Sequence, residues 1–584
     1  MSPCMHVGCG RDDQGSFQAM EVDFGIDGYV TDSPGFTCVL KQRYQDFLVN
    51  ELDSQGRVVR LTNLESSVEQ GTSVNETSSG TLWGADIDDQ LTQLEEGRRS
   101  EPVSIPCQDS DKAERTDIHK AIRDRFANLQ SATSANNGLQ SIIVTRAAAG
   151  QQSSRKRRHW PSDRQGDYVR FVLYKENKDS QFALSLIGRL LGVKASSIGL
   201  AGTKDRRGVT SQLATVYRIE PDRMAGLNSQ LRGIRLGNFE YCENQLYLGD
   251  SKGNRFTVVM RNIQVDRDLV EAGIKQWSER GFINFYGTQR FGTTAVATHT
   301  VGKAILKKQW AAVVDLLLQP RDDAPEEVAE CYRVWASTKD PSRALAAIPA
   351  RRRHTCIEGQ LLMGLKKHGL NDFSNAFRNV PRNSRMLYVH GLQSYIWNKL
   401  VSRRVAEYGQ QLLVGDAVFT NDQDDALHTL TEGEAGTWEP FGLCVPLPSA
   451  SAVFENKQML QWFEEILTEQ GLSLDDFRNA EKDYAVHGDV RRVFVKARDV
   501  EYGFYQYDDY TLPLALTDLD LLQGKPEPQS VPDGRYLALA LSFSLPPGSY
   551  ATMAIRELCR MDTGKQYQST LNDYDAPTPI DGDN

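Results

Sequence analysis

A single carboxylate lies among several cations in a short polar turn of the chain. The turn is Gly202-Thr-Lys-Asp-Arg-Arg-Gly208, and its carboxylate is Asp205. Nearby positive charge favours the ionised form of a carboxylate, and an ionised carboxylate can act as a nucleophile. The same cations can contact phosphates. A solvated charged hairpin is the ordinary alternative, because charge runs usually lie on the surface, and the turn alone does not decide between the two.

Apolar segments on both sides predict that this turn joins two strands. Ile198–Ala201 has the pattern of the end of a buried strand, and Val209–Ile219 has that of another strand with loose alternation. Before them, apolar residues at helical spacing predict a helix over 181–191. Ser180 is its expected N-cap and Gly192 its expected end.

Composition limits the class of protein. The net charge of −10 argues mildly against a simple nucleic-acid binder, but the cations occur in short clusters that would focus a positive field if they met in one groove. No apolar run is long enough to predict a membrane span. The nine cysteines are scattered, which fits free thiols in a reducing compartment. Cys4, His6 and Cys9 are weak evidence for a metal, since structural zinc usually takes four ligands.

The composition also divides the chain. Residues 1–20 and the tail 572–584 are expected to be disordered or loose. From Thr62 to about Lys112 the residues are mostly polar, which predicts a solvated insertion within a longer extra segment, 62–166. A basic run at Arg155–Arg158 has three interpretations: a nuclear-import signal, an RNA contact or a solvated loop.

The second half changes character. Apolar spacing indicates mainly helical structure from about 300 to 530, most clearly over Val301–Leu318 and Arg385–Tyr408. A buried strand is then expected at Tyr536–Leu545.

A set of segments, taken together and in order, resembles the TruD family of RNA pseudouridine synthases in its eukaryotic branch. The Gly-Thr-Lys-Asp-Arg motif is the specific one, and it contains Asp205. The matching segments are Arg43–Glu51, Leu173–Asp179, Ala201–Arg207, Gly253–Phe256, Asn284–Gly292, Arg385–Asn398 and Ser544–Thr552.

The resemblance implies an α+β fold: a pseudouridine-synthase catalytic domain with a mixed β-sheet, interrupted by a mainly helical inserted domain. The catalytic domain would comprise residues 21–283 and 495–571, and the inserted domain residues 284–494. The shift from strands to helices near 290, and the later return of a strand, fit that division independently.

The implied activity is the isomerisation of uridine to pseudouridine within RNA, which needs no cofactor and no metal. The resemblance leaves open whether Asp205 attacks the base, attacks C1′ or removes a ribose proton. The implied partner is RNA: transfer RNA, with messenger and small nuclear RNA as further substrates. We expect a monomer without an obligate protein partner or a membrane association, in the nucleus, the cytoplasm or both.

The resemblance also assigns residues that bind the substrate. A base must be extruded before it can be attacked, and stacking on an aromatic ring contributes about 1–3 kcal/mol per base. An amide can read the uracil edge. Lys204 and Arg206 are expected to hold phosphates, and Gly208, where the family usually has Ala, is expected only to loosen the turn. The other implied residues are Phe47, Asn254 and Tyr550 at the base, Phe256 as a pocket aromatic, and Lys41 and Arg290 as electrostatic partners.

Two other functions are considered. An RNA-binding protein with this fold but without activity would have no need of a carboxylate facing RNA phosphates. A phosphate-binding loop at Gly202-Thr-Lys204 lacks the glycine spacing of a P-loop, and a strand rather than a helix is expected to follow it.

Overall fold

The structure is a computed structural model of the chain. It describes residues 21–66, 83–107, 112–126, 129–136, 139–146, 160, 164, 166–292, 296–321, 324, 326–421, 426–564, 567–568 and 571. The expectations for residues 1–20, the basic run 155–158 and the tail 572–584 lie outside the described residues.

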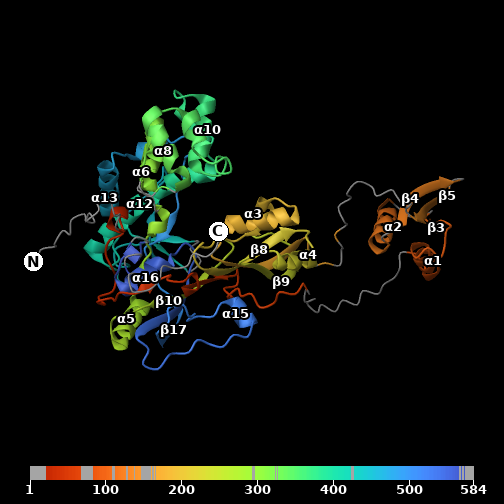
Figure 1. The fold of residues 1–584 in the computed structure, drawn as a ribbon, viewed down its shortest axis with the longest axis horizontal. Coiled ribbons are helices and arrows are strands. Elements are labelled where there is room, and N and C mark those ends of the chain that lie inside the picture. The colour runs from red at the N-terminus through yellow and green to blue at the C-terminus, as the bar shows by residue number, and fades with distance from the viewer. Residues whose placement is uncertain are drawn as a thin grey trace, which may run out of the picture.

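A mixed nine-stranded sheet forms the centre of the molecule (Figure 1). Its main path runs β17-β18-β10-β2-β8-β6-β9, with β1 paired to β10 and β7 to β8. The pair β2–β8 is parallel and the other pairs are antiparallel. The strands are β1 (Val39–Leu40), β2 (Phe47–Leu52), β6 (Tyr168–Glu176), β7 (Ile198–Leu200), β8 (Val209–Tyr217), β9 (Ile234–Cys242), β10 (Gly253–Arg261), β17 (Arg498–Tyr507) and β18 (Tyr536–Leu545). The expected α+β class with a mixed sheet is confirmed.

Alternation along these strands gives the sheet two distinct faces. Phe256 on β10 is opposite Val49 and Phe543, while its neighbour Thr257 is opposite Leu48 and Ser542. We call them the Phe47 face, which also carries Glu51 and Asn254, and the Leu48 face, which also carries Asn50 and Ser211. Helices cover the sheet: α3 (Ser180–Leu191), α4 (Pro221–Ala225), α5 (Arg267–Arg280), α15 (Asp518–Leu522) and α16 (Ala551–Cys559).

The helix before the Asp205 turn starts one residue earlier than expected. Asp179, rather than Ser180, is the N-cap of α3, and its carboxylate accepts hydrogen bonds from the amides of Gln181 and Phe182. Gly192 ends the helix with φ of 70°, as expected for a left-handed C-cap. Ser180 thereby becomes available for another contact, described below.

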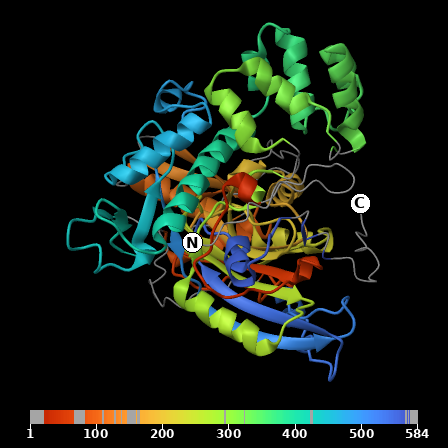
Figure 2. The same cartoon turned by 90° about the vertical axis from the view of Figure 1, so that its left-hand side faces the viewer.

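A mainly helical segment lies between two short strands that pair with each other, β11 (Phe282–Ile283) and β16 (Phe494–Val495). Figure 2 shows its helices on one side of the sheet. The helix expected over Val301–Leu318 is two helices, α6 and α7, because the chain turns at 307–309. The helices are α6 (Thr298–Leu306), α7 (Trp310–Leu318), α8 (Glu326–Thr338), α9 (Pro341–Ala346), α10 (Ile357–His368), α11 (Phe373–Arg378), α12 (Arg382–Tyr408), α13 (Lys457–Glu469) and α14 (Leu474–Arg478).

This segment also has a small antiparallel sheet of its own, in the order β13-β12-β14-β15. Its strands are β12 (Ala417–Phe419), β13 (Leu427–Thr429), β14 (Leu443–Pro446) and β15 (Val490–Arg492). One continuous core joins the helices to the Phe47 face of the central sheet. Within the described residues, no helix has the length and apolar character needed to cross a bilayer.

The part of the polar insertion that the structure describes from residue 83 to residue 107 is folded rather than simply solvated, so the expectation is wrong for these residues. Apolar side chains of this part and of the elements that follow it lie at helical or alternating positions and pack into a separate core that includes Leu91, Ile105, Ile122, Ile142 and Val144. The structured elements are α1 (Ala85–Glu95), β3 (Val103–Pro106), α2 (Lys112–Arg125), β4 (Leu129–Asn136) and β5 (Leu139–Arg146).

Candidate active site

Asp205 lies in the loop between β7 and β8, and buried side chains of neighbouring elements hold that loop. Lys175 of β6 donates from Nζ to the carbonyl oxygens of Lys204 (3.3 Å) and Asp205 (2.8 Å). Ser180 Oγ exchanges hydrogen bonds with the backbone of Lys204, and Gln212 Nε2 donates to the Gly202 carbonyl. The Asp205 side chain itself keeps 40% of its surface exposed. The loop is thus fixed from behind while its carboxylate faces solvent.

Lys175 was not among the residues identified from the sequence. Burial lowers its pKa to about 8, an effect that Asp179 and Asp205 partly offset. The residue is fully buried although it is a lysine in a strand. A signal was available, because Lys175 follows the apolar Leu173 at the same-face spacing of a strand.

Lys204 has a different role from the expected one. Its ammonium lies inside the protein, 2.8 Å from Glu51 Oε2, and the two side chains are only 5% and 1% exposed. The other Glu51 oxygen accepts the amide of Leu213. Burial raises the pKa of Glu51, and the Lys204 ammonium opposes part of that shift. Lys204 therefore anchors the loop to β2 and does not present its charge to a phosphate.

Lys41 provides the cation next to the carboxylate. Its Nζ lies 3.4 Å from Asp205 Oδ2 and 3.7 Å from the centre of the Phe47 ring. Burial lowers the pKa of Lys41, and the charge of Asp205 opposes that shift. Lys41 adopts φ of 51°, an unfavourable conformation for a residue with a Cβ, and Arg207 donates to its carbonyl at 2.8 Å. Backbone and side chain together place this ammonium beside Asp205.

The expected aromatic residues are more buried than a free stacking platform would be. Phe47 is 2% exposed, and Lys41 covers its ring, so a base can stack there only after Lys41 moves. Phe256 is 7% exposed. It lies between Phe47 (5.9 Å between ring centres) and Phe543 (5.6 Å). Phe256 thus supports Phe47 and has no open face for a base.

Gly208 is constrained by the same ring. A Cβ at this position would lie 2.7 Å from the Phe47 carbonyl oxygen and 3.2 Å from its ring. The glycine therefore allows close packing of the turn on β2, which corrects the expectation that it only loosens the turn. Arg206 and Arg207 are exposed at the end of the loop, where Arg206 is positioned as expected for a phosphate contact.

Asn254 lies on the same face, opposite Glu51 on β2 and Leu545 on β18. Its amide oxygen is buried and accepts no hydrogen bond from the described residues. A buried acceptor without a partner is costly, so an N–H donor from a bound ligand would be favourable at this position. The expected uracil-reading role of Asn254 fits this geometry.

Tyr550 follows β18 and is the N-cap residue of α16. It is half-buried, and its ring lies 6.3 Å from that of Tyr286. The hydroxyls of its neighbours Ser549 and Thr552 are also buried without partners among the described residues. Buried polar atoms without a partner among the described residues therefore occur both at Asn254 on β10 and beside Tyr550 at the start of α16.

Two arginines meet near Tyr550. Arg491 lies 4.0 Å from the Tyr286 ring centre and 5.9 Å from that of Tyr550, held by two hydrogen bonds to Asn284. Arg290 lies 5.9 Å from the Tyr286 ring. Arg290 was expected at the site, whereas Arg491 was not among the expected site residues. It lies more than 200 residues away from Tyr286 along the chain, so only the fold brings the two together.

The Phe47 face presents a partly exposed carboxylate with an adjacent ammonium. It also carries an unpaired amide oxygen opposite Glu51, whose partner Lys204 precedes Asp205 in the chain. These groups can bind a polar heterocycle and act on it with a carboxylate nucleophile or base. Groups of three or more side chains that could hold a metal ion do not occur in the described part of the chain.

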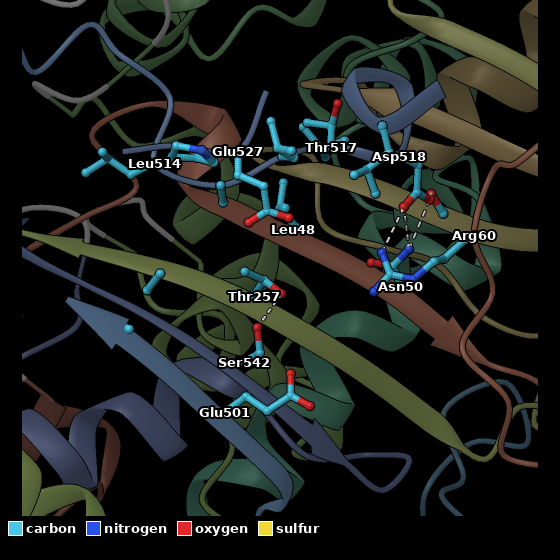
Figure 3. A pocket seen from close by; sticks show the side chains of 18 of the residues that line it. Leu48, Asn50, Arg60, Thr257, Glu501, Leu514, Thr517, Asp518, Glu527 and Ser542 are labelled. Atoms are coloured by element: carbon cyan, nitrogen blue, oxygen red, sulfur yellow. Dashed lines mark hydrogen bonds and ion pairs between the residues drawn. The ribbon is translucent and has the colours of Figure 1, made fainter. Parts of the chain in front are cut away.

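A separate cavity of about 370 Å³ lies on the opposite, Leu48 face of the sheet (Figure 3). Asp518 is at one end, where it accepts hydrogen bonds from Asn50 (3.1 Å), the Leu61 amide (2.9 Å) and Ser211 (2.5 Å). The hydroxyls of Thr257 and Ser542 pair at 2.8 Å. None of the residues lining this cavity has a buried side-chain polar atom without a partner, as far as the described residues go.

Comparisons with known proteins identify the family. The family model described as "tRNA pseudouridine synthase D (TruD)" matches residues 149–558. The chain is 39% identical over 555 residues to the pseudouridylate synthase 7 homolog of Bos taurus, covering 94% of this chain and 83% of that one. It is 31% identical over 631 residues to the multisubstrate pseudouridine synthase 7 of Schizosaccharomyces pombe, covering 95% and 92%.

A solved structure shares the fold. It is the putative tRNA pseudouridine synthase D (TruD) of Methanosarcina mazei, which is 22% identical to this chain. The match has a TM-score of 0.56 and covers 92% of this chain and 97% of that one.

Proposed function

The chain belongs to the eukaryotic branch of the TruD family and is an RNA pseudouridine synthase; on that premise we propose that Asp205 is its catalytic group and that transfer RNA is among its substrates. The observation that carries the assignment is the exposed Asp205 carboxylate on a loop that buried side chains hold in place. A carboxylate that acts on an extruded base must be held in a fixed position, and these buried side chains supply that constraint.

The reaction rearranges one nucleoside without adding or removing atoms. The bond between N1 of uracil and C1′ of ribose breaks, and a bond between C5 and C1′ forms. The proton on C5 is lost, and N1 gains a proton. Asp205 acts on the base, on C1′ or on a ribose proton, and Lys41 balances its charge. The fixed loop keeps the carboxylate at the same place while the uracil turns.

The other residues have roles in binding. The unpaired Asn254 oxygen accepts from an N–H of the uracil, Tyr550 contacts its ring, and Arg206 holds a phosphate of the strand. Phe47 contacts the base once Lys41 has moved from its ring.

The substrate proposal draws on the names of similar proteins. The names of the family and of the M. mazei protein specify tRNA, and the S. pombe relative is called multisubstrate. We accordingly propose transfer RNA as a substrate, with messenger and small nuclear RNA as further ones. A monomer in the nucleus, the cytoplasm or both remains part of this proposal.

The experiment is pseudouridine mapping on transfer RNA, small nuclear RNA and messenger RNA incubated with the wild type or with Asp205→Ala. We expect product in transfer RNA with the wild type and none with the variant, while the RNA affinity of the variant stays within a few-fold. Equal product with the variant would refute the role of Asp205. Product in other RNAs but not in transfer RNA would refute the substrate assignment.

A further inference from the structure

A second cavity, of about 390 Å³, lies beside the first half of α12. Met386 and Val486 are buried in its wall, and His390 is half-buried. Arg382, Asn383 and His487 line it as exposed residues. We call it the α12 pocket. An apolar floor with a cationic and amide rim is suited to a planar base attached to a phosphate.

The polar groups of the α12 pocket are available for a ligand. Arg382, Asn383 and His487 make no side-chain hydrogen bond or ion pair within the described residues. His390 has one contact, between Nδ1 and Gln393 Oε1 at 3.4 Å. The nearby Asp483 is within ion-pair distance of both Arg378 and Arg385, so it does not neutralise Arg382. No carboxylate lines the pocket.

Two hydrogen bonds link the α12 pocket to Arg290, a residue expected at the candidate active site. Arg290 Nε donates to Ser394 Oγ at 3.4 Å, and that hydroxyl donates to the carbonyl of His390, one helical turn earlier. Burial lowers the pKa of His390, and the positive charges of Arg290 and Arg382 lower it further. The His390 ring therefore lies within the electrostatic range of both arginines, one at each site.

We propose that the α12 pocket binds a nucleotide that flanks the target uridine in the same RNA strand. The base lies on Met386 and Val486, its phosphate contacts Arg382 and His487, and the Asn383 amide and His390 ring read its edge. This inference rests on the proposed RNA substrate and adds a subsite to it. Flanking bases read in this way give sequence preference, because single-stranded RNA exposes its base edges.

The test compares how the affinity of the wild type and of a variant depends on the length of the RNA. Arg382→Ala/His487→Ala replaces two exposed side chains, so the fold should be retained, as an unchanged thermal midpoint would show. Fluorescein-labelled single-stranded RNAs carry one uridine and are shortened by one nucleotide at a time from either end. Binding is measured by anisotropy, which does not depend on catalysis. Arg403→Ala is the matched control, since Arg403 is on the same helix but pairs with Glu465.

We expect the wild type to lose about tenfold in affinity when one particular flanking nucleotide is removed. The double variant should bind the long RNA about tenfold more weakly and show no further loss at that step. Its slope of log Kd against log salt should decrease by about 0.7 for one lost phosphate contact. Arg403→Ala should behave like the wild type.

Results that would contradict the α12 pocket proposal can be told apart from results that would contradict the proposed pseudouridine synthase activity. If the wild type and the double variant lose affinity equally at every step, the pocket does not bind a flanking nucleotide, whether or not pseudouridine forms. If free AMP binds and Arg382→Ala/His487→Ala abolishes that binding while RNA of every length binds both proteins equally, the pocket takes a free nucleotide and the proposal is wrong. Absence of pseudouridine with all RNAs would refute the proposed function alone.

Discussion

The two faces of the central sheet differ in how their polar groups are used. On the Phe47 face, Asp205 stays 40% exposed and Asn254 has a buried oxygen without a partner in the described structure. On the Leu48 face, a cavity of about 370 Å³ is lined by groups that bond to one another, with Asp518 at their centre. The Phe47 face thus combines a partly exposed carboxylate with a buried amide oxygen that has no partner in the described structure. The network around Asp518 is satisfied by its own hydrogen bonds and would gain little from a ligand.

The largest effect is expected from the buried ion pair between Glu51 and Lys204, which holds the Asp205 loop on the Phe47 face. Glu51→Gln leaves the buried Lys204 ammonium without its carboxylate, and breaking a buried pair from one side costs about 3–5 kcal/mol. We expect the free energy of unfolding, measured with urea, to fall by that amount. Glu51→Gln/Lys204→Met removes both charges and should restore part of the loss. A single variant that unfolds like the wild type would contradict the anchoring role.

Asp518→Asn makes the matching change on the Leu48 face. It replaces an oxygen that accepts several hydrogen bonds, so we expect unfolding to become easier by about 1–3 kcal/mol. The kcat/KM of the folded protein for pseudouridine formation should stay within about twofold, since no group of the Phe47 face changes. A tenfold fall in kcat/KM with an unchanged free energy of unfolding would indicate that the active site lies on the Leu48 face instead.

Lys175→Met tests whether Lys175 acts only by positioning the Asp205 loop. The variant removes the donor to the Lys204 and Asp205 carbonyls, and we expect kcat to fall about tenfold, equivalent to about 1.4 kcal/mol, with KM little changed. The pKa of Lys175 is lowered to about 8 by burial, so the ammonium is charged below that pH and neutral above it.

The wild type should therefore lose kcat as the pH rises through about 8. The contribution of Lys175 to this loss is the difference between the profile of kcat against pH for the wild type and that for Lys175→Met. Identical alkaline limbs in the wild type and in Lys175→Met would exclude this role.

The smallest effect is expected at the edge of the Leu48 cavity. Glu527 is exposed there, and Glu527→Gln should change stability by less than about 0.5 kcal/mol. RNA affinity should change less than about twofold, whereas Arg206→Gln on the other face should weaken binding and reduce its salt dependence. If Glu527→Gln changed RNA affinity more than Arg206→Gln does, RNA would bind on the Leu48 face, which would contradict the proposal.

Much of the fold was predictable where local pattern decides structure. The strand Tyr536–Leu545 and the left-handed Gly192 followed directly from alternation and capping chemistry. The polar insertion was misjudged because its few apolar residues are hidden by polar composition, although they meet in one core.

The sequence indicated which residues could contribute to the site, but it did not indicate how deeply each is buried or what it pairs with. Lys41 was expected as an electrostatic partner, and the fold places its ammonium beside Asp205. Lys204 and Phe256 were assigned to the substrate, yet partners distant in sequence, Glu51 and Phe543, bury them. Arg491 reaches Tyr286 from a different part of the chain for the same reason. A sequence shows which charges exist, whereas only the fold shows which of them are already neutralised.

The most direct measurement compares Asp205→Asn with Asp518→Asn, the same chemical change on opposite faces of one sheet. Both proteins are incubated in excess over a transfer RNA substrate, and the pseudouridine formed in a single turnover is quantified by mass spectrometry. We predict no product above the enzyme-free background with Asp205→Asn, and product at close to the wild-type rate with the folded fraction of Asp518→Asn. Product with Asp205→Asn at the wild-type rate, or its loss only with Asp518→Asn, would contradict the account.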